Sequence, residues 1–221
     1  LDFCWNDGSL YLVTSQGLFE SRIVRKTEGK HDFVLCLLNP EPVVRGKVAH
    51  LCSDGKTNLY FSVNQRKVVH YDLVAKKTSL IKEYSVVNRL FLRHGYLWIC
   101  RLWDDIICYD LKTNEERVIS MEGKDQSEFS NSYVTDLVLK DNRTFYLTTW
   151  NGLYKLRFDN DNLCKSPFVL TLLTKNEKAF HSSIENKMTS LFWDDKQQIL
   201  WVGTFGGGVV KFVICDSMYS R

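Results

Sequence analysis

The sequence predicts an all-β fold, and more specifically a β-propeller of five four-stranded antiparallel blade repeats. A composition rich in aromatic residues, the lack of helical periodicity and a recurring segment pattern carry this prediction. Phe, Tyr and Trp make up 13% of the 221 residues, which is typical of strands. No window of about eleven residues places apolar side chains at i, i+3, i+4 and i+7, as an amphipathic helix requires.

The recurring pattern is a short strand, a tight Asp/Asn/Gly turn and an aromatic-led strand, in most copies with a further apolar run. The aromatic-led strands begin at Leu10, Leu59, Leu97, Phe145 and Leu200. A four-stranded unit that recurs every ~40–55 residues cannot bury both faces alone, and radial packing of such units gives a propeller. We predict one domain over 1–221 with repeats at 1–39, 48–84, 87–120, 134–174 and 188–214.

The fifth repeat has only three predicted strands, because no fourth apolar run follows Ile214. A closed ring of five blades would therefore leave one blade with an exposed edge, which natural sheets avoid. We expect the five blades to be consecutive members of a larger propeller.

Composition and charge exclude several classes of function. The excess of Lys and Arg over Asp and Glu is +3, too small to indicate nucleic-acid binding. The longest apolar runs, such as Phe33–Leu38 and Phe168–Leu173, are far shorter than the ~18 residues of a membrane span. The seven cysteines form no CxxC pair or Cys/His cluster with metal-ligand spacing, so we predict no metal and no cofactor. We expect most of these cysteines to be small buried side chains.

The sequence contains no catalytic motif. It lacks GxSxG, HExxH, the Walker loop and GxGxxG, and its paired carboxylates lie in predicted turns. His50 and His70 lie on predicted strands, where we expect structural roles. The protein is therefore not predicted to be an enzyme.

The last repeat, LWVGTFGGGVVKF preceded by NKMTSLFWDD, resembles the repeat of two-component regulator propellers, and Ser130–Leu156 is similar to it as well. The other copies depart from it, since Cys100-Arg101 and Ser62-Val63 stand where the repeat has Gly-Thr. The resemblance implies seven blades and the periplasmic sensor region of a hybrid two-component histidine kinase of Bacteroidetes. The resemblance also implies that the ligand is an oligosaccharide released from a glycan. It implies further that the kinase and the membrane anchor lie outside this chain, and it is compatible with a homodimer.

A propeller brings the turns between second and third strands to the same face as the loops that join the blades. Loops are predicted on this face at Pro40–Lys47, Met121–Tyr133 and Lys175–Lys187. The last two are long, and long loops on a rigid scaffold often carry function. Aromatic side chains at the turns suit sugar stacking, and neighbouring polar groups suit hydroxyl or acidic groups. The predicted ligand-binding residues are Trp103, Trp150, Phe205, Arg101, Asn151, Arg45, Lys47 and His181.

Three alternatives stay open. In the first, the turn aromatics pack under the long loops instead of meeting a ligand. In the second, the protein is a cytosolic interaction scaffold, which the seven cysteines favour slightly. The third and weakest is a propeller lyase or hydrolase, which would need His and carboxylate side chains together on the turn face, where the sequence offers only His181. By contrast with Trp150, we expect Trp201 to be packed in the core because it lies within a predicted strand. The basic residues of the turn face favour an acidic sugar, although the small net charge makes this a weak preference.

Overall fold

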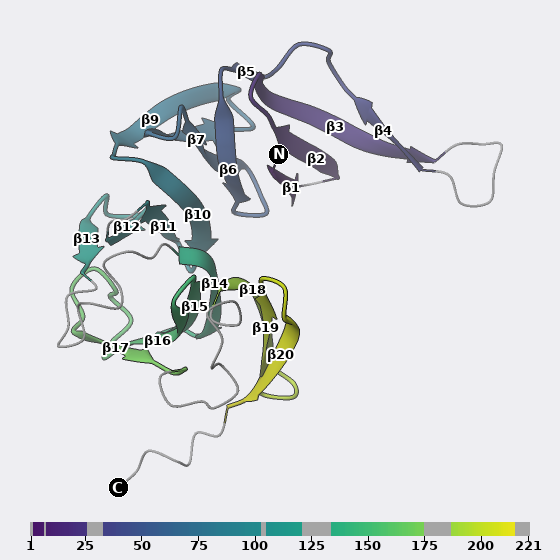
Figure 1. The fold of residues 1–221 in the computed structure, drawn as a ribbon. Coiled ribbons are helices and arrows are strands. Elements are labelled where there is room, and N and C mark those ends of the chain that lie inside the picture. The colour runs from purple at the N-terminus through teal and green to yellow at the C-terminus, as the bar shows by residue number, and fades with distance from the viewer. Residues whose placement is uncertain are drawn as a thin grey trace, which may run out of the picture. The chain divides into compact units, whose positions relative to one another are not determined.

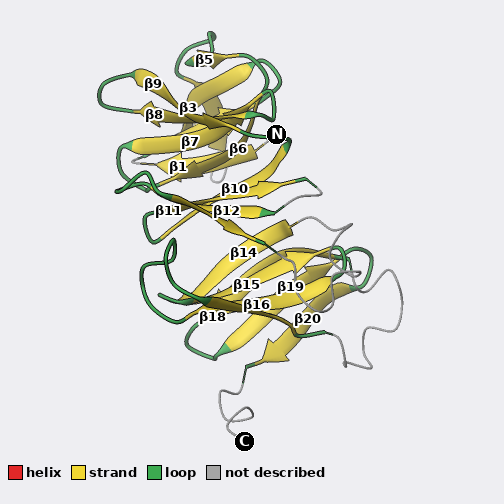
Figure 2. Ribbon diagram, turned by 90° about the vertical axis from the view of Figure 1, so that its left-hand side faces the viewer, coloured by secondary structure: helices red, strands yellow, loops and turns green. Residues whose placement is uncertain are grey.

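The computed structural model describes residues 2–6, 8–25, 33–102, 105–120, 134–174 and 187–214. Every element in these ranges is a β-strand (Figure 2). The strands form five antiparallel sheets in chain order, here called blades 1 to 5. The prediction of an all-β chain with five successive blades is therefore confirmed. The chain divides into two compact units, Leu1–Gly95 and Tyr96–Arg221.

The first unit contains blades 1 and 2 and the strand that opens blade 3 (Figure 1). In blade 1 the strands follow each other in chain order: β1 (Asp2–Asn6), β2 (Ser9–Val13), β3 (Gly17–Arg25) and β4 (Phe33–Leu37). Blade 2 repeats this order with β6 (Val48–Ser53), β7 (Asn58–Val63), β8 (Lys67–Asp72) and β9 (Lys77–Glu83), and β10 (Val87–Arg93) follows.

The second unit contains the remaining strands. They are β11 (Tyr96–Arg101), β12 (Ile106–Asp110) and β13 (Glu116–Ile119) of blade 3; β14 (Val134–Asp141), β15 (Thr144–Thr149), β16 (Gly152–Phe158) and β17 (Phe168–Leu172) of blade 4; and β18 (Met188–Asp194), β19 (Ile199–Thr204) and β20 (Gly208–Val213) of blade 5. Blade 5 has three strands within the described residues, as the sequence indicates.

Aspartate side chains close two of the predicted tight turns between first and second strands. Asp141 Oδ1 accepts hydrogen bonds from the backbone N–H groups of Arg143 at 2.9 Å and Thr144 at 2.8 Å. Asp54 Oδ1 does the same for Lys56 at 2.8 Å and Asn58 at 3.0 Å. A short acidic side chain at the end of the first strand thus closes the hairpin in both blades.

One strand was not predicted. Residues 40–47 were expected to form a loop, but β5 (Val44–Arg45) within them pairs with β3. The pairing depends on Gly17, which lies opposite Arg45 in the register. A Cβ atom on Gly17 would lie 2.2 Å from the Val44 carbonyl oxygen, so no other residue type would allow β5 to approach so closely.

Apolar side chains from adjacent blades form the cores of the two units. In the first unit, Tyr11, Val13 and Leu18 of blade 1 pack with Leu59 and Phe61 of blade 2. In the second, Tyr146 and Leu153 of blade 4 pack with Met188, Leu200 and Val202 of blade 5. Blades 1, 2, 4 and 5 therefore each contribute a face to an interblade core, as radial packing requires.

The buried strand tryptophan is Trp98 and not Trp201. Trp98 is fully buried, and its ring centroid lies 4.6 Å from that of Phe145. Trp201 is only partly buried, and its ring lies 5.9 Å from the Lys211 ammonium. The expectation of a packed Trp201 is wrong because its side chain shares a sheet face with Phe192, opposite to the face that packs on blade 4.

The described cysteines are all free, and their burial varies. Cys100 and Cys108 are buried, as predicted, whereas Cys4, Cys52 and Cys164 are half-buried. Cys36 is exposed, contrary to the prediction. It lies on β4, which pairs with β3 and carries exposed apolar neighbours such as Leu35 and Leu37.

Candidate functional site

The turn between β15 and β16 in blade 4 has the same hydrogen bonds as its counterpart in blade 1. Thr149 Oγ1 accepts from the N–H of Asn151 at 3.0 Å and donates to the carbonyl of Gly152 at 3.3 Å. In blade 1, Thr14 Oγ1 accepts from Gln16 at 3.0 Å and donates to Gly17 at 3.3 Å. The backbone of this turn is therefore set by its threonine and its glycine.

The tip of this turn is the position that differs between the two blades. Blade 1 has Ser15 at the tip, and blade 4 has Trp150, whose side chain is 39% exposed. Because the same turn forms with a serine at the tip, the fold of the turn does not require an aromatic residue there. Trp150 therefore supplies a large, partly exposed ring that backbone geometry does not account for.

Lys187 connects this tryptophan to the turn of blade 5. The Lys187 ammonium lies 5.1 Å from the centroid of the Trp150 ring, within reach of a cation–π interaction. The Lys187 carbonyl accepts a 2.8 Å hydrogen bond from the N–H of Phe205. Phe205 is 62% exposed at the tip of the β19–β20 turn. Two predicted aromatic residues, Trp150 and Phe205, are thus linked through one lysine.

Sequence reasoning included Lys187 only as the end of a loop. The repeat contained a signal that could have identified it. Lys47, a predicted site residue, directly precedes the first strand of blade 2, as Lys187 precedes that of blade 5. The Lys47 carbonyl also accepts a 2.8 Å hydrogen bond from the turn of its own blade, at the N–H of Asn64. The two lysines therefore occupy equivalent positions.

Arg101 and Asn151 lie in the second unit at the ends of their turns. Arg101 ends β11 and is partly buried, and its Nε donates to the carbonyl of Asp105 at 3.3 Å. This bond closes the β11–β12 turn on itself. Asn151 is exposed beside Trp150. Trp103, His181, the loop 121–133 and residues 175–186 of the other predicted loop lie outside the described residues.

Arg45 and Lys47 lie in the first unit, beside the turns of blades 1 and 2. Both side chains are exposed. Gly46 N donates to the carbonyl of Gln16 at 3.1 Å, which holds this segment against the blade 1 turn. Arg45 forms an ion pair with Glu41, so its charge is partly neutralised. Of the predicted basic residues, Arg45 is therefore less suited to an acidic ligand than Lys47.

The two strand histidines differ in their surroundings. His70 is bonded at both ring nitrogens, with Nε2 2.7 Å from Asn58 Oδ1 and Nδ1 3.2 Å from Ser79 Oγ. His50 Nε2 is buried without a hydrogen-bond partner among the described residues. Burial, with a smaller contribution from Arg89, lowers the pKa of His50 from 6.5 to about 4. His50 is therefore neutral near pH 7.

Within the described ranges, no three His, Cys, Asp or Glu side chains come close enough together to hold a metal ion. In the same part of the chain, no helix is present that is long and apolar enough to cross a membrane.

The architecture is found in solved structures of low sequence identity. The β-propeller domain of Cps50 (Swd1) from Myceliophteria thermophila matches 100% of this chain and 70% of its own, with TM-score 0.55 and 14% identity. This chain has a β-propeller fold. A protein described as the extracellular domain of the hybrid two-component system BT4673 of B. thetaiotaomicron matches 95% of this propeller, with TM-score 0.62 and 16% identity. PorZ, a surface component of the type-IX secretion system of Porphyromonas gingivalis, matches 95% with TM-score 0.63 and 12% identity.

The propeller spans 26% of the length of the BT4673 domain and 31% of that of PorZ. At these identities the similarity establishes the fold alone. No family model and no curated protein matches the sequence.

Proposed function

We propose that this propeller is a non-catalytic ligand-sensing module of a hybrid two-component sensor, and that its ligand is an oligosaccharide derived from a glycan. The observation that carries the proposal is the partly exposed Trp150 ring at a turn tip where blade 1 has only Ser15. Sugars bind proteins by stacking their apolar C–H faces on such rings. A contact between two aromatic rings contributes about 0.5–1.5 kcal/mol beyond the area it buries, and we take a similar magnitude for the sugar contact.

The groups around Trp150 support a sugar that carries an acidic substituent. Lys187 places a positive charge over one face of the ring, and Asn151 adds an amide that can bond hydroxyl groups. Phe205, held by the Lys187 carbonyl, adds a second exposed aromatic surface. We propose Trp150, Asn151, Lys187 and Phe205 as the centre of the site, with Arg101 at the neighbouring turn of blade 3.

The similarity to an extracellular domain of a hybrid two-component system and to a bacterial surface protein supports a periplasmic or extracellular location. In this proposal, ligand binding changes either the conformation of the sensor or the way two copies of it dimerise. This change is transmitted to a kinase outside this chain. The membrane anchor also lies outside this chain.

Calorimetric titration with neutral and acidic oligosaccharides tests the proposal. Trp150→Ala is expected to weaken binding several-fold and leave the melting temperature nearly unchanged, because the turn keeps its threonine and glycine. The matched control is Trp98→Ala, which removes a fully buried ring and is expected to cost about 3–5 kcal/mol of stability. If Trp150→Ala destabilises the protein as much as Trp98→Ala, the ring is a core residue and the proposed site is wrong.

A cytosolic protein-interaction scaffold is the second candidate function. The observation that favours it is that all described cysteines are free thiols, as is usual in a reducing compartment. If the intact protein folds and binds no oligosaccharide of the panel, the scaffold becomes the better proposal.

A further inference from the structure

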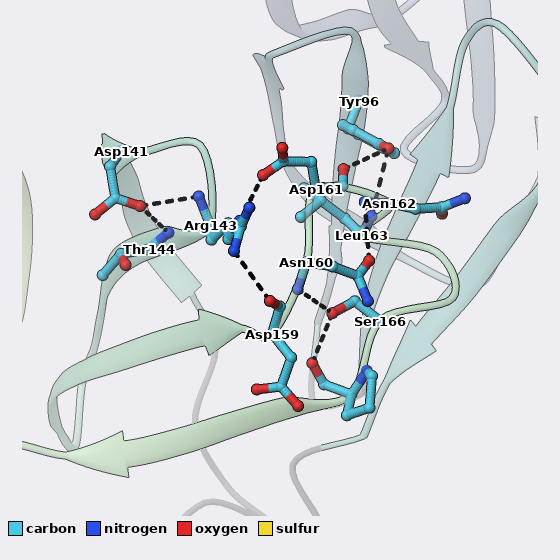
Figure 3. Close-up of polar contacts among 11 residues, drawn as sticks. Tyr96, Asp141, Arg143, Thr144, Asp159, Asn160, Asp161, Asn162, Leu163 and Ser166 are labelled. Carbon is cyan, nitrogen blue, oxygen red and sulfur yellow. Dashed lines mark hydrogen bonds and ion pairs between the residues drawn. The ribbon is translucent and has the colours of Figure 1, made fainter.

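The loop between β16 and β17 of blade 4 is fastened to blade 3 by polar contacts (Figure 3). Tyr96 of β11 donates its hydroxyl hydrogen to the carbonyl of Asp161 at 3.3 Å and accepts from the N–H of Leu163 at 3.4 Å. Arg117 of β13 donates to the carbonyls of Ser166 and Leu163. The loop therefore bridges two neighbouring blades of the second unit.

The loop is also braced internally and at its base. Asn160 N donates to Ser166 Oγ at 2.8 Å, and Asp159 N donates to the Pro167 carbonyl at 3.1 Å. Arg143 Nε forms a 2.6 Å ion pair with Asp161 Oδ1, which Figure 3 shows beside the loop. On the blade 3 side, Lys165 Nζ lies 2.8 Å from Glu115 Oε1. Residues 159–167 are thus held in one position relative to blade 3.

Cys164 lies in this loop and meets blade 3 at Cys108. Its Sγ is 3.5 Å from the Cys108 carbonyl oxygen and 3.6 Å from that of Glu115. In the register of blade 3, Trp98, Cys108 and Arg117 lie side by side across three strands and share a sheet face. Trp98 packs on Phe145 of blade 4, so this face is directed towards blade 4.

The Cys108 side chain therefore points from blade 3 towards the loop that carries Cys164. Burial, and after it the neighbouring Cys164 thiol, raises the pKa of the Cys108 thiol, so the two side chains lie near each other. Disulfides need this arrangement, in which two short side chains face each other from backbones already held close together.

We propose that Cys108 and Cys164 form a disulfide between blades 3 and 4 when the protein meets an oxidising disulfide such as oxidised glutathione. The Cys164 thiolate attacks one sulfur of the oxidant, forms a mixed disulfide and releases the first reduced thiol. The Cys108 thiolate then attacks Cys164 Sγ and releases the second. The two cysteines lose two electrons and two protons, and one oxidant disulfide becomes two thiols.

The order of attack follows from accessibility. Cys164 is half-buried, whereas Cys108 is fully buried, so the oxidant can reach only Cys164 first. Burial raises the pKa of both thiols, and only the thiolate reacts. The reaction is therefore expected to be slow at pH 7 and faster at pH 8.5. This inference does not depend on the proposed oligosaccharide ligand.

Incubation of the folded protein with oxidised glutathione, followed by alkylation under denaturing conditions and peptide mass spectrometry, tests the proposal. We expect one linked pair of peptides, containing Cys108 and Cys164, with the mass of two hydrogens lost. The bond would close a loop with a sequence separation of 56, so the melting temperature is expected to rise by about 5 °C or more.

Two variants complete the experiment. Cys164→Ser should lack both the linked peptides and the rise in melting temperature. The matched control is Cys36→Ser, which removes an exposed cysteine of the other unit and should retain both. The proposal is overturned if Cys164 carries only glutathione while Cys108 stays reduced, or if the linked peptides contain another pair such as Cys4 and Cys52. Neither result would affect the oligosaccharide titration, which is measured separately.

Discussion

The carboxylate of Asp136 in the first strand of blade 4 accepts a 2.7 Å hydrogen bond from the backbone N–H of Leu191 in the first strand of blade 5. The first unit contains the same relationship, because Asp2 Oδ2 accepts from the N–H of Leu51 at 3.1 Å. In both blades the second carboxylate oxygen accepts from the N–H of the next residue, Phe3 or Leu137. One repeat position therefore links each of these blades to the blade that follows.

Replacing Asp136 by alanine should destabilise the protein by about 1–3 kcal/mol, because the partly buried N–H of Leu191 loses its acceptor. Asp136→Asn should retain most of the stability, since the amide oxygen can take the place of the carboxylate. Urea denaturation of the two variants measures the difference. Glu83→Ala, at an exposed position on β9, is the control. A loss for Asp136→Ala no larger than that of the control would show that the Leu191 contact contributes little.

His50 should make the protein less stable as the pH falls from about 6.5 to about 4. Its pKa is lowered to about 4 in the folded state, mainly by burial, so the folded state favours the neutral ring. The stabilisation is present above the unfolded pKa of 6.5 and is lost as the pH falls towards the folded value. The loss should be on the order of 3 kcal/mol at pH 4. Urea midpoints measured between pH 4 and pH 7.5 give the slope.

The variant that tests this assignment is His50→Asn. His50 has a φ of 56°, a conformation that asparagine tolerates better than most residues, and asparagine does not titrate. The variant should show a shallower dependence of stability on pH over the same range. If the wild-type and variant slopes are equal, another group causes the acid sensitivity.

Arg117 and Arg143 both contact the loop of residues 159–167, but their substitution should have different effects. Arg117 is partly buried, bonds two carbonyls and lies 4.9 Å from the centroid of the Phe168 ring. Arg117→Ala should therefore cost about 1.5–3 kcal/mol. The Arg143–Asp161 pair is largely exposed, with 49% and 62% of the side chains accessible, so Arg143→Ala should change the urea midpoint little. The reverse order would contradict this interpretation.

The outer faces of the first and last blades should promote self-association of the 221-residue chain. Phe3 and Trp5 of blade 1 are 64% and 54% exposed, and Phe192 and Val209 of blade 5 are 63% and 69% exposed. Trp5→Ser combined with Val209→Ser should reduce the oligomeric species seen by light scattering, because exposed apolar patches drive association. The melting temperature should change little. A monodisperse wild-type chain melting cooperatively above ~65 °C would contradict this expectation.

The sequence allowed the strands and tight turns to be predicted because their determinants are local. Asp141 closes its own hairpin, and the aromatic-led strands pack against the next blade with side chains that alternate along the strand. Features that depend on distant neighbours were missed. The pairing of β5 with β3 depends on Gly17, and the burial of Trp98 but not Trp201 depends on which sheet face meets another blade.

The candidate site was predicted less completely than the fold. Trp150 and Phe205 were identified from their places in turns, but nothing in a single turn indicates that Lys187 connects them. The equivalence of Lys187 and Lys47 becomes clear only when the repeat is known together with the hydrogen bond that each lysine carbonyl accepts from the turn of its own blade. Trp103 and His181 remain predictions.

The matching turns of blades 1 and 4 have an evolutionary consequence. A Cβ atom on Gly17 or Gly152 would lie within 2.5 Å of a neighbouring oxygen, and both threonines make the same bonds. Selection on the fold therefore acts on the threonine and glycine, and leaves the tip residue, Ser15 or Trp150, open to drift. Under the proposed function, a lineage can acquire or lose specificity by exchanging single tip residues, with tryptophan in one blade and serine in another, while the scaffold stays unchanged.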